Sequence, residues 1–113
     1  MTLIYKICPK SLWSDAKAKG VFEGAPVDIA DGYIHFSSAE QLRETANKHF
    51  AGLEDLLLIA VDSSKLEPAL KWEPSRGGAL FPHLYDALDP ANASWIKPLS
   101  LGSDGAHEFP PLD

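Results

Sequence analysis

The chain has 113 residues, of which 45% are hydrophobic and 23% are charged, and its net charge at pH 7 is -6. This length suits one domain with a single core, and the composition lies far from that of disordered chains. Sixteen acidic residues against ten basic ones repel a phosphate backbone, so extended nucleic-acid binding is disfavoured. A small cationic pocket is compatible with this charge, since such a pocket needs only one or two basic side chains.

The number of cysteines and the length of the apolar runs indicate the cellular location of the protein. The chain holds one cysteine, Cys8, which cannot form an intramolecular disulfide, and the N-terminal segment lacks the pattern of a signal peptide. The longest apolar run, Leu56 to Val61, is far shorter than the roughly 18 residues that span a bilayer. We therefore expect a cytoplasmic protein that does not insert into membranes.

The first third of the chain predicts a strand, a helix and connecting chain. Residues 3–8 are rich in β-branched and aromatic side chains, which indicates a strand that stops at Pro9. A helix is predicted from Ser11 to Gly20, with Leu12, Trp13 and Ala16 on one face. Residues 21–32 have no clear period and are predicted as connecting chain that ends in a tight turn.

The middle of the chain predicts a half-buried strand and a second helix. Residues 33–37 alternate, with Tyr33, His35 and Ser37 on one side. A capping box, Ser38 with Gln41 or Ser37 with Glu40, then opens a helix that packs on a sheet through Leu42, Ala46 and Phe50 and ends at Gly52.

Three further strands are predicted, and together the elements indicate the fold class. Residues 56–61 are apolar throughout and predict a central strand covered on both faces. Residues 69–73 alternate with Trp72 inward until Pro74 breaks the strand, and residues 94–98 form a last short strand. Interspersed strands and helices favour an α+β fold with small mixed or antiparallel sheets and two main helices.

Two parts of the chain differ in how much they can bury. Residues 1–100 are predicted as one α+β domain. Residues 101–113 contain Gly102, Gly105, Pro110 and Pro111 and have little to bury, so they predict a loose C-terminal tail.

The polar side of the strand at residues 33–37 is the first candidate site. It places the imidazole of His35 between a phenol and a hydroxyl, a row that can bind a ligand or transfer protons. An anion beside Ser37 and Ser38 would meet the free amides of the following helix. The alternative is that these residues face water, or that His35 is a hydrogen-bonded core histidine.

The stretch LKWEPSRGGALFPHLYD, residues 70–86, is the second candidate, because it mixes charges, glycines and rings among apolar side chains. Glu73 ends a strand, Arg76 can bind phosphate or carboxylate oxygens through two hydrogen bonds, and Gly77 lets a ligand approach the backbone. The alternative is a structural ion pair of Glu73 with Arg76 beside a hairpin turn.

His83 and Tyr85 follow in the same stretch, between apolar side chains, and Pro82 fixes the backbone before His83. Each can serve a ligand, or else pack or satisfy a local hydrogen bond. We predict His35, Glu73 and His83 as catalytic residues, and Ser37, Ser38, Arg76, Gly77 and Tyr85 as ligand-binding residues.

Metal binding and cysteine chemistry have little support in the sequence. Four histidines are present, but they lack the His-Glu-x-x-His spacing, and the chain has no paired cysteines, so no metal is expected. Cys8 lies just before Pro9 with no histidine near it in sequence, which argues against a nucleophile.

Four segments resemble, as a set, the bacterial domain-of-unknown-function family numbered 952. They are IYKICPKSLW, DGYIHFSSAEQLRETANKHFAG, DLLLIAVD and LKWEPSRGGALFPHLY, and they cover roughly residues 3–97. That family looks like a remote relative of the ADP-ribosyltransferase fold, in which two small sheets form a cleft for NAD or an ADP-ribose-like ligand.

The resemblance implies roles for particular residues. Lys6 and His35 would orient the nucleotide, Glu73 would stabilise the cationic ribose formed as nicotinamide leaves, and Arg76 would hold phosphate. The first strand departs from the pattern of the related RNA 2'-phosphotransferases. Lys6 stands where those enzymes use histidine or arginine, and no Gly-Thr follows it.

Two functions of different classes follow. The first is a polar cleft that takes a phosphorylated or nucleotide-like small molecule, with NAD or an ADP-ribose-like compound as ligand, in a divergent transferase or its inactive descendant. The second is a non-catalytic interaction module with an exposed patch of Trp13, Trp72, Phe81 and Tyr85.

Overall fold

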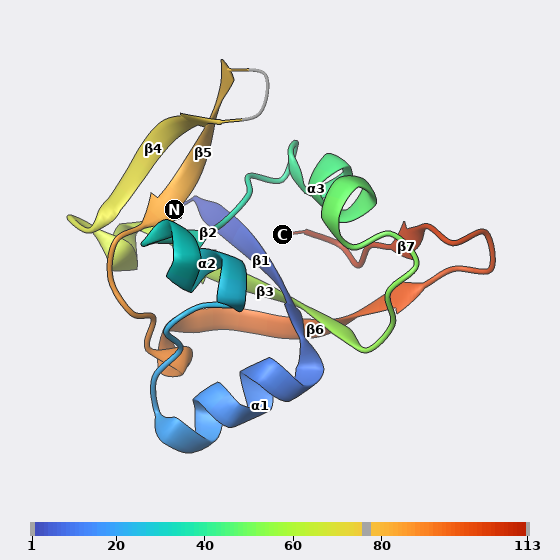
Figure 1. Cartoon of the computed structure of the whole chain (residues 1–113), viewed down its shortest axis with the longest axis horizontal. Coiled ribbons are helices and arrows are strands. Elements are labelled where there is room, and N and C mark those ends of the chain that lie inside the picture. The colour runs from blue at the N-terminus through green and yellow to red at the C-terminus, as the bar shows by residue number, and fades with distance from the viewer. Residues whose placement is uncertain (1, 76–77, 113) are drawn as a thin grey trace.

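The computed structural model describes residues 2–75 and 78–112. Figure 1 shows its helices and strands. In chain order they are β1 (Leu3–Pro9), α1 (Lys10–Lys19), α2 (Pro26–Asp31), β2 (Ile34–His35), α3 (Leu42–His49), β3 (Leu56–Asp62), β4 (Leu70–Ser75), β5 (Ala79–Leu84), β6 (Ala93–Leu101) and β7 (His107–Glu108). Two short 3-10 helices are also present, Ser63–Leu66 after β3 and Pro90–Asn92 before β6.

The strands form two antiparallel sheets, which confirms the α+β class. The larger sheet has the order β1-β3-β6-β7 and the smaller one the order β2-β5-β4. In Figure 1 the hairpin of β4 and β5 extends away from the larger sheet, while α1 and α3 lie on different sides of it.

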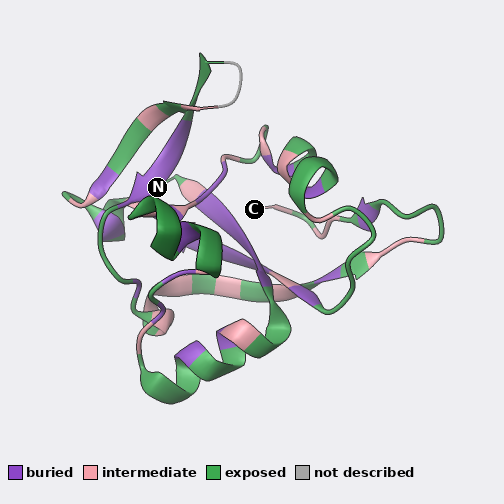
Figure 2. Ribbon diagram, viewed as in Figure 1, coloured by how far each residue is buried: buried purple, intermediate pink, exposed green. Residues whose placement is uncertain are grey.

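The strand β3 is the centre of the core, as its uniformly apolar sequence predicts. Ile59 and Val61 belong to a buried cluster with Trp13 of α1 and with residues of the smaller sheet. Leu58 and Ala60 belong to a second buried cluster, under α3. Alternate side chains of one strand therefore enter two cores. Figure 2 shows the buried course of β3 and of its neighbour β1.

The two predicted helices are present. Trp13 and Ala16 are the buried residues of α1, which ends at Gly20 in the left-handed conformation, with φ 81°. Leu42 and Ala46 are buried on α3. The backbone amide of Ser38 donates to the Gln41 side chain at 3.0 Å, but the helix begins at Leu42 with Gln41 as its N-cap, so Ser38 lies in the turn before the helix and does not cap it.

The helix α2 corrects the prediction of connecting chain over residues 21–32. Pro26 occupies its first turn, where a missing N–H costs nothing, and the amide of Ala25 donates to Asp28 Oδ2 at 2.7 Å. Gly32 ends the helix with φ 88°, a conformation that favours glycine. Its six residues are too few for a helical period to be visible in the sequence.

A short bridge joins the two sheets. The amide of Tyr5 donates to the carbonyl of Ser37 at 2.8 Å, and the amide of Ser37 donates to the carbonyl of Tyr5 at 2.9 Å. One residue earlier, the amide of Phe36 donates to the carbonyl of Pro82 at 3.0 Å. The segment after β2 therefore passes from β5 of the small sheet to β1 of the large one, which places Lys6 beside His35.

The C-terminal segment packs against the domain, in contrast to the loose tail predicted for residues 101–113. His107 is 7% exposed, and its Nε2 lies 2.9 Å from the carbonyl oxygen of Leu53. Phe109 and Leu112 pack on the cluster under α3, and the hydroxyl of Tyr5 donates to the Leu112 carbonyl. Apolar side chains spaced along this glycine- and proline-rich segment give it enough surface to bury.

Trp72 is 41% exposed, which corrects its prediction as an inward residue. β4 is an edge strand, and in its pairing with β5 Trp72 lies opposite Pro82 while Pro74 lies opposite Leu80. The strand thus continues through Pro74, because an edge strand tolerates a residue without an N–H. Among the described residues, no helix has the length and apolar character needed to cross a membrane.

Candidate functional site

One face of the small sheet gathers the polar residues predicted from sequence. His35 of β2 lies opposite His83 of β5, and Glu73 of β4 lies opposite Phe81. Directly paired residues of antiparallel strands have their side chains on one side, and so do residues two apart along a strand. We call this the site face. Lys71 and Phe81 also lie on it, and the candidate site is built from five of its residues: Tyr33, His35, Glu73, His83 and Tyr85.

A buried carboxylate, that of Asp28, anchors one end of the site face. Its Oδ2 lies 2.8 Å from Lys6 Nζ, and its Oδ1 lies 2.6 Å from His35 Nδ1 and 3.1 Å from the His35 amide nitrogen. The side chains of Asp28 and Lys6 are 0% and 7% exposed. A buried charge requires such a partner, so Lys6 is committed to this ion pair.

The pKa of Asp28 reflects two opposing effects. Burial is the largest influence and opposes ionisation, but the hydrogen bond from His35, followed by the charge and hydrogen bond of Lys6, outweighs it and lowers the pKa to about 2. The carboxylate is therefore ionised throughout the physiological range.

His35 is bound through both ring nitrogens. Nδ1 contacts Asp28, and Nε2 lies 3.0 Å from Oδ2 of Asp31, the last residue of α2. The His35 side chain is 32% exposed and that of Asp31 is 47% exposed. The imidazole thus has one partner inside the protein and one at the surface.

Glu73 makes the second contact with an imidazole. Its Oε1 lies 2.9 Å from His83 Nδ1 and accepts the hydroxyl of Tyr85 at 2.6 Å. The hydrogen bond from Tyr85, followed by that from His83, lowers the pKa of Glu73. The same bond to Glu73, together with some desolvation, raises the pKa of Tyr85 to about 12.

The ring of Tyr33 lies among the other rings. Its centroid is 4.2 Å from that of His83, 4.7 Å from that of His35 and 5.1 Å from that of Tyr85. Partial burial, followed by the negative charges of Asp31 and Glu73, raises the pKa of Tyr33. The ring cluster is a stacking surface with acids at its edges.

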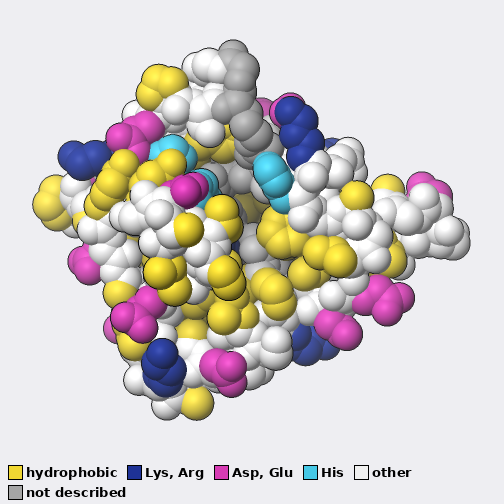
Figure 3. All heavy atoms as spheres, viewed as in Figure 1, with side chains coloured by type: hydrophobic (Ala, Val, Ile, Leu, Met, Phe, Trp, Pro, Cys, Tyr) yellow, Lys and Arg dark blue, Asp and Glu magenta, His cyan; other side chains and the backbone are white. Residues whose placement is uncertain are grey.

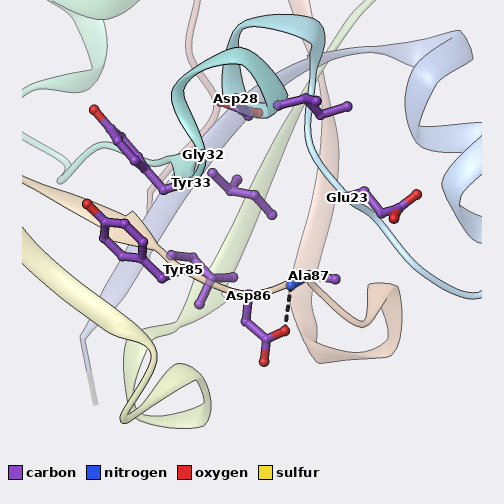
Figure 4. A pocket seen from close by; sticks show the side chains of 10 residues that line it. Glu23, Asp28, Gly32, Tyr33, Tyr85, Asp86 and Ala87 are labelled. Atoms are coloured by element: carbon purple, nitrogen blue, oxygen red, sulfur yellow. Dashed lines mark hydrogen bonds between the residues drawn. The ribbon is translucent and has the colours of Figure 1, made fainter.

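An open pocket of about 400 Å³ adjoins this cluster. Figure 4 shows Tyr33 and Tyr85 side by side at one end of the pocket, with Glu23 at the other end and Asp86 below. Figure 3 shows a hollow in the middle of the molecular face with histidine side chains at its rim, whereas the residues that line the pocket include Tyr33 and Tyr85 but no histidine. The pocket volume is in the range that small-molecule sites occupy.

Four predicted site residues converge: His35, Glu73, His83 and Tyr85 all belong to the site face. Lys6 contacts the site through Asp28.

Ser37 and Ser38 have other partners. The hydroxyl of Ser37 lies 3.0 Å from that of Thr45, and the amide of Ser38 is bound by Gln41. The predicted phosphate ligands Arg76 and Gly77 lie outside the described residues.

The sequence reasoning missed Asp28 and Asp31. Both lie on α2, a segment that the sequence predicts as connecting chain, and Asp28 stands there among turn-forming residues. The available signal was local: Pro26 at a first helical position, Asp28 two residues later, and Gly32 as a stop signal. Such a pattern predicts the helix, but it does not predict that the aspartate binds a histidine of another element.

The structure also shows how possible metal ligands and the thiol are placed in the described part of the chain. Among residues 2–75 and 78–112, no group of three or more His, Cys, Asp or Glu side chains is arranged to hold a metal ion. Burial raises the pKa of the Cys8 thiol to about 11, and the residue is 0% exposed. Cys8 is thus a packed core residue.

Known proteins resemble the chain over almost its whole length. A crystal structure of protein CC0527 from Caulobacter crescentus is 50% identical to it with a TM-score of 0.91, and the match covers 95% of this chain and 94% of that one. The solution NMR structure of CC0527 is 52% identical with a TM-score of 0.85, over 94% and 91% of the two chains. No curated protein matches the chain. The model of the family described as "Protein of unknown function (DUF952)" matches residues 7–96, and the chain therefore belongs to that family.

Proposed function

We propose that the site face binds a nucleotide-like small molecule, of the NAD or ADP-ribose kind, in a cytoplasmic protein with a fold related to the ADP-ribosyltransferases. The observation that carries the proposal is the cluster of Tyr33, His35, His83 and Tyr85 rings beside the Glu73 carboxylate. Two small antiparallel sheets, joined where this cluster lies, support the relation to that fold.

Stacking of an aromatic ring of the ligand on Tyr33 and Tyr85 is the best supported part of the proposal. Tyr85 is 44% exposed and its ring lies beside that of Tyr33 (Figure 4). A base or nicotinamide ring can stack on these faces, since every such ring offers a π surface. The positive charge of a nicotinamide ring also suits the nearby carboxylates of Asp31 and Glu73.

If the protein is a transferase, Glu73 is the residue proposed to act in the chemical step. Its lowered pKa keeps the carboxylate ionised near neutral pH, and its position among hydrogen-bond donors fixes its direction. A fixed negative charge stabilises the ribose cation that develops as the bond to nicotinamide breaks. Nicotinamide leaves with the electron pair of that bond, and the oxygen of an acceptor hydroxyl or of water bonds to the same ribose carbon and gives up its proton to solvent. His35, whose side chain is 32% exposed, presents a ring N–H for a ribose oxygen. The buried His83 acts through its contact with Glu73, and Arg76 is the proposed phosphate ligand.

Binding is tested by titrating the 15N-labelled protein with NAD, ADP-ribose and inorganic phosphate while amide shifts are followed. NAD and ADP-ribose should shift the amides of Tyr33, His83 and Tyr85, and Tyr33→Leu should weaken binding about tenfold through the lost stacking. Tyr33→Phe, which keeps the ring, should bind nearly as the parent does. Millimolar ligand that leaves these amides unmoved would contradict the proposal.

Turnover is tested separately by measuring nicotinamide release from NAD. A transferase should release nicotinamide, and Glu73→Gln should lower the rate at least 100-fold while stacking keeps NAD bound. Binding without release identifies an inactive descendant of the transferases.

A second candidate function is a protein-interaction surface on the β4–β5 hairpin. Trp13 and Phe81 are buried, so the predicted four-residue aromatic patch is not formed. Trp72 and Leu80 are 41% and 52% exposed, and their pairing partners place both on the side of the hairpin opposite to Glu73 and His83. Self-association that Trp72→Ser abolishes would support this function.

A further inference from the structure

Both ring nitrogens of His35 face carboxylate oxygens. Nδ1 lies 2.6 Å from Asp28 Oδ1, and Nε2 lies 3.0 Å from Asp31 Oδ2. A carboxylate ion can only accept hydrogen bonds, so both bonds form when both ring nitrogens carry a proton. In this state the ring is a double donor and cannot remove a proton from a substrate.

The two carboxylates hold the ring in different ways. Asp28 has a side chain that is 0% exposed, and it also binds the Lys6 ammonium at 2.8 Å and the Ala25 amide at 2.7 Å. Moving it would break all of these contacts and leave a buried ammonium without a partner.

Asp31 is much less constrained. Its side chain is 47% exposed. It ends α2, where the negative end of the helix dipole disfavours a carboxylate. Water can replace its contact with His35 at little cost, because an exposed ion pair contributes little free energy.

We propose that Asp28 is a positioning residue for His35, and that the Asp31 carboxylate occupies the place of a ligand oxygen on His35 Nε2. The inference rests on the proposed function and specifies one of its contacts. The ligand displaces Asp31 and brings an acceptor oxygen, either a ribose hydroxyl or a phosphate oxygen, to the exposed N–H.

The surroundings of His35 fit this exchange. Gly32 and Tyr33, which directly follow Asp31, line the open pocket. The Tyr33 ring covers one side of the imidazole, with the centroids 4.7 Å apart, and His83 meets it edge-on at 5.5 Å. The ring cannot turn without disturbing these neighbours, so a ligand approaches Nε2 from the side of Asp31.

Affinity measurements on Asp31 variants test the exchange. Calorimetry with ADP-ribose, ribose and inorganic phosphate is done on the parent protein, Asp31→Ala and Asp31→Asn. Loss of a competing surface ion pair should tighten binding of ADP-ribose by roughly two- to fivefold. A gain shared by phosphate identifies a phosphate oxygen as the acceptor, and a gain shared by ribose identifies a hydroxyl.

Matched variants distinguish the displacement of Asp31 by the ligand from a general effect of negative charge on affinity. Glu23→Ala removes an acid that lines the pocket and that, within the described part of the chain, forms no hydrogen bond or ion pair with His35, so it should change affinity less than Asp31→Ala does. His35→Gln should abolish the gain from Asp31→Ala. Weaker or unchanged binding in Asp31→Ala would overturn the exchange, since it would make Asp31 a ligand contact or a bystander.

Imidazole 15N spectra of the ligand-free protein test the division of roles. Asp31→Ala should move the Nε2 resonance of His35 and leave Nδ1 in place, and ADP-ribose added to the parent should move the same Nε2 resonance. Equal movement of both nitrogens would overturn the positioning role of Asp28. Failure of every probe to bind parent and variants would overturn the proposed function and the exchange, while the ligand-free spectra still decide the role of Asp28.

Discussion

The imidazole rings of His35 and His83 lie 5.5 Å apart with an interplanar angle of 70°, because the two residues are paired across β2 and β5. Each ring has its Nδ1 on a carboxylate, that of Asp28 for His35 and that of Glu73 for His83. A carboxylate on Nδ1 fixes the ring and leaves Nε2 as the nitrogen that meets other groups. The small sheet thus carries two oriented imidazoles on neighbouring strands.

The hydrogen bond between Glu73 and Tyr85 predicts a tyrosine titration. Glu73→Gln should lower the pKa of Tyr85 from about 12 toward the ordinary tyrosine value, because the bond to the carboxylate is the largest cause of the rise. Ultraviolet absorbance against pH measures the three tyrosines of the chain, and Tyr85→Phe identifies the affected one. Glu44→Gln, on α3, is the control and should leave the titration unchanged. A Tyr85 titration that Glu73→Gln does not alter would exclude the bond.

The low pKa of Asp28 predicts a dependence of stability on acid. The folded pKa of about 2 lies below the ordinary value of about 3.9 for the unfolded chain. The stabilising contribution is therefore fully present above the unfolded pKa and is lost as the pH falls toward 2. It amounts to about 2 to 3 kcal/mol, and urea unfolding at a series of pH values should show its loss between about pH 5 and pH 2.

Replacement of Asp28 tests the buried ion pair directly. Asp28→Asn should lower the free energy of unfolding by about 3 to 5 kcal/mol, because it leaves the Lys6 ammonium buried without a counter-charge. The double variant Asp28→Asn with Lys6→Met should regain part of this loss. If the double variant were no more stable than Asp28→Asn, the ion pair would not explain the destabilisation.

Burial of Cys8 predicts an unreactive thiol. The residue is 0% exposed and its pKa is raised to about 11, so little thiolate forms at pH 8 and reagents cannot reach it. A colorimetric disulfide reagent should label no thiol in the folded protein and one thiol per chain in concentrated guanidinium. Rapid labelling without denaturant would contradict this placement.

The packing of the C-terminal segment predicts that its apolar side chains contribute to the free energy of unfolding. Phe109→Ala with Leu112→Ala should cost about 2 kcal/mol, in line with two half-buried apolar side chains. Tyr5→Phe, which removes the hydroxyl bound to the Leu112 carbonyl, should cost about 1 kcal/mol. Pro111→Ala, at an exposed position, serves as the control. Thermal unfolding measures all three, and equal melting temperatures would show that the segment contributes nothing.

The parts of the fold that sequence reasoning recovered are those with strong local signals. β3 has an uninterrupted apolar run, and α1 and α3 have apolar faces and glycines beyond their ends. The short α2 has too few residues for a period. Alternation predicts Trp72 inward, because it cannot distinguish an edge strand from a covered one, and β4 is an edge strand.

The candidate site was predictable in its residue types and only partly in its contacts. Mixed polar chemistry at strand ends indicated His35, Glu73, His83 and Tyr85. The pairing of His35 with His83 joins segments 48 residues apart (83 − 35), and no local pattern specifies such a register. The contact of Lys6 with Asp28 depends in turn on α2, and so it could not be inferred before that helix was known.

The two reciprocal hydrogen bonds between Tyr5 and Ser37 join the two sheets, so their opening shows when the binding site comes apart. Lys6 directly follows Tyr5, and His35 lies two residues before Ser37. A fluctuation that separates the two sheets therefore also breaks the contacts of Asp28 with Lys6 and His35. A compound that binds only when the Lys6–Asp28–His35 contacts are intact will slow deuterium uptake at the Tyr5 and Ser37 amides without contacting either residue.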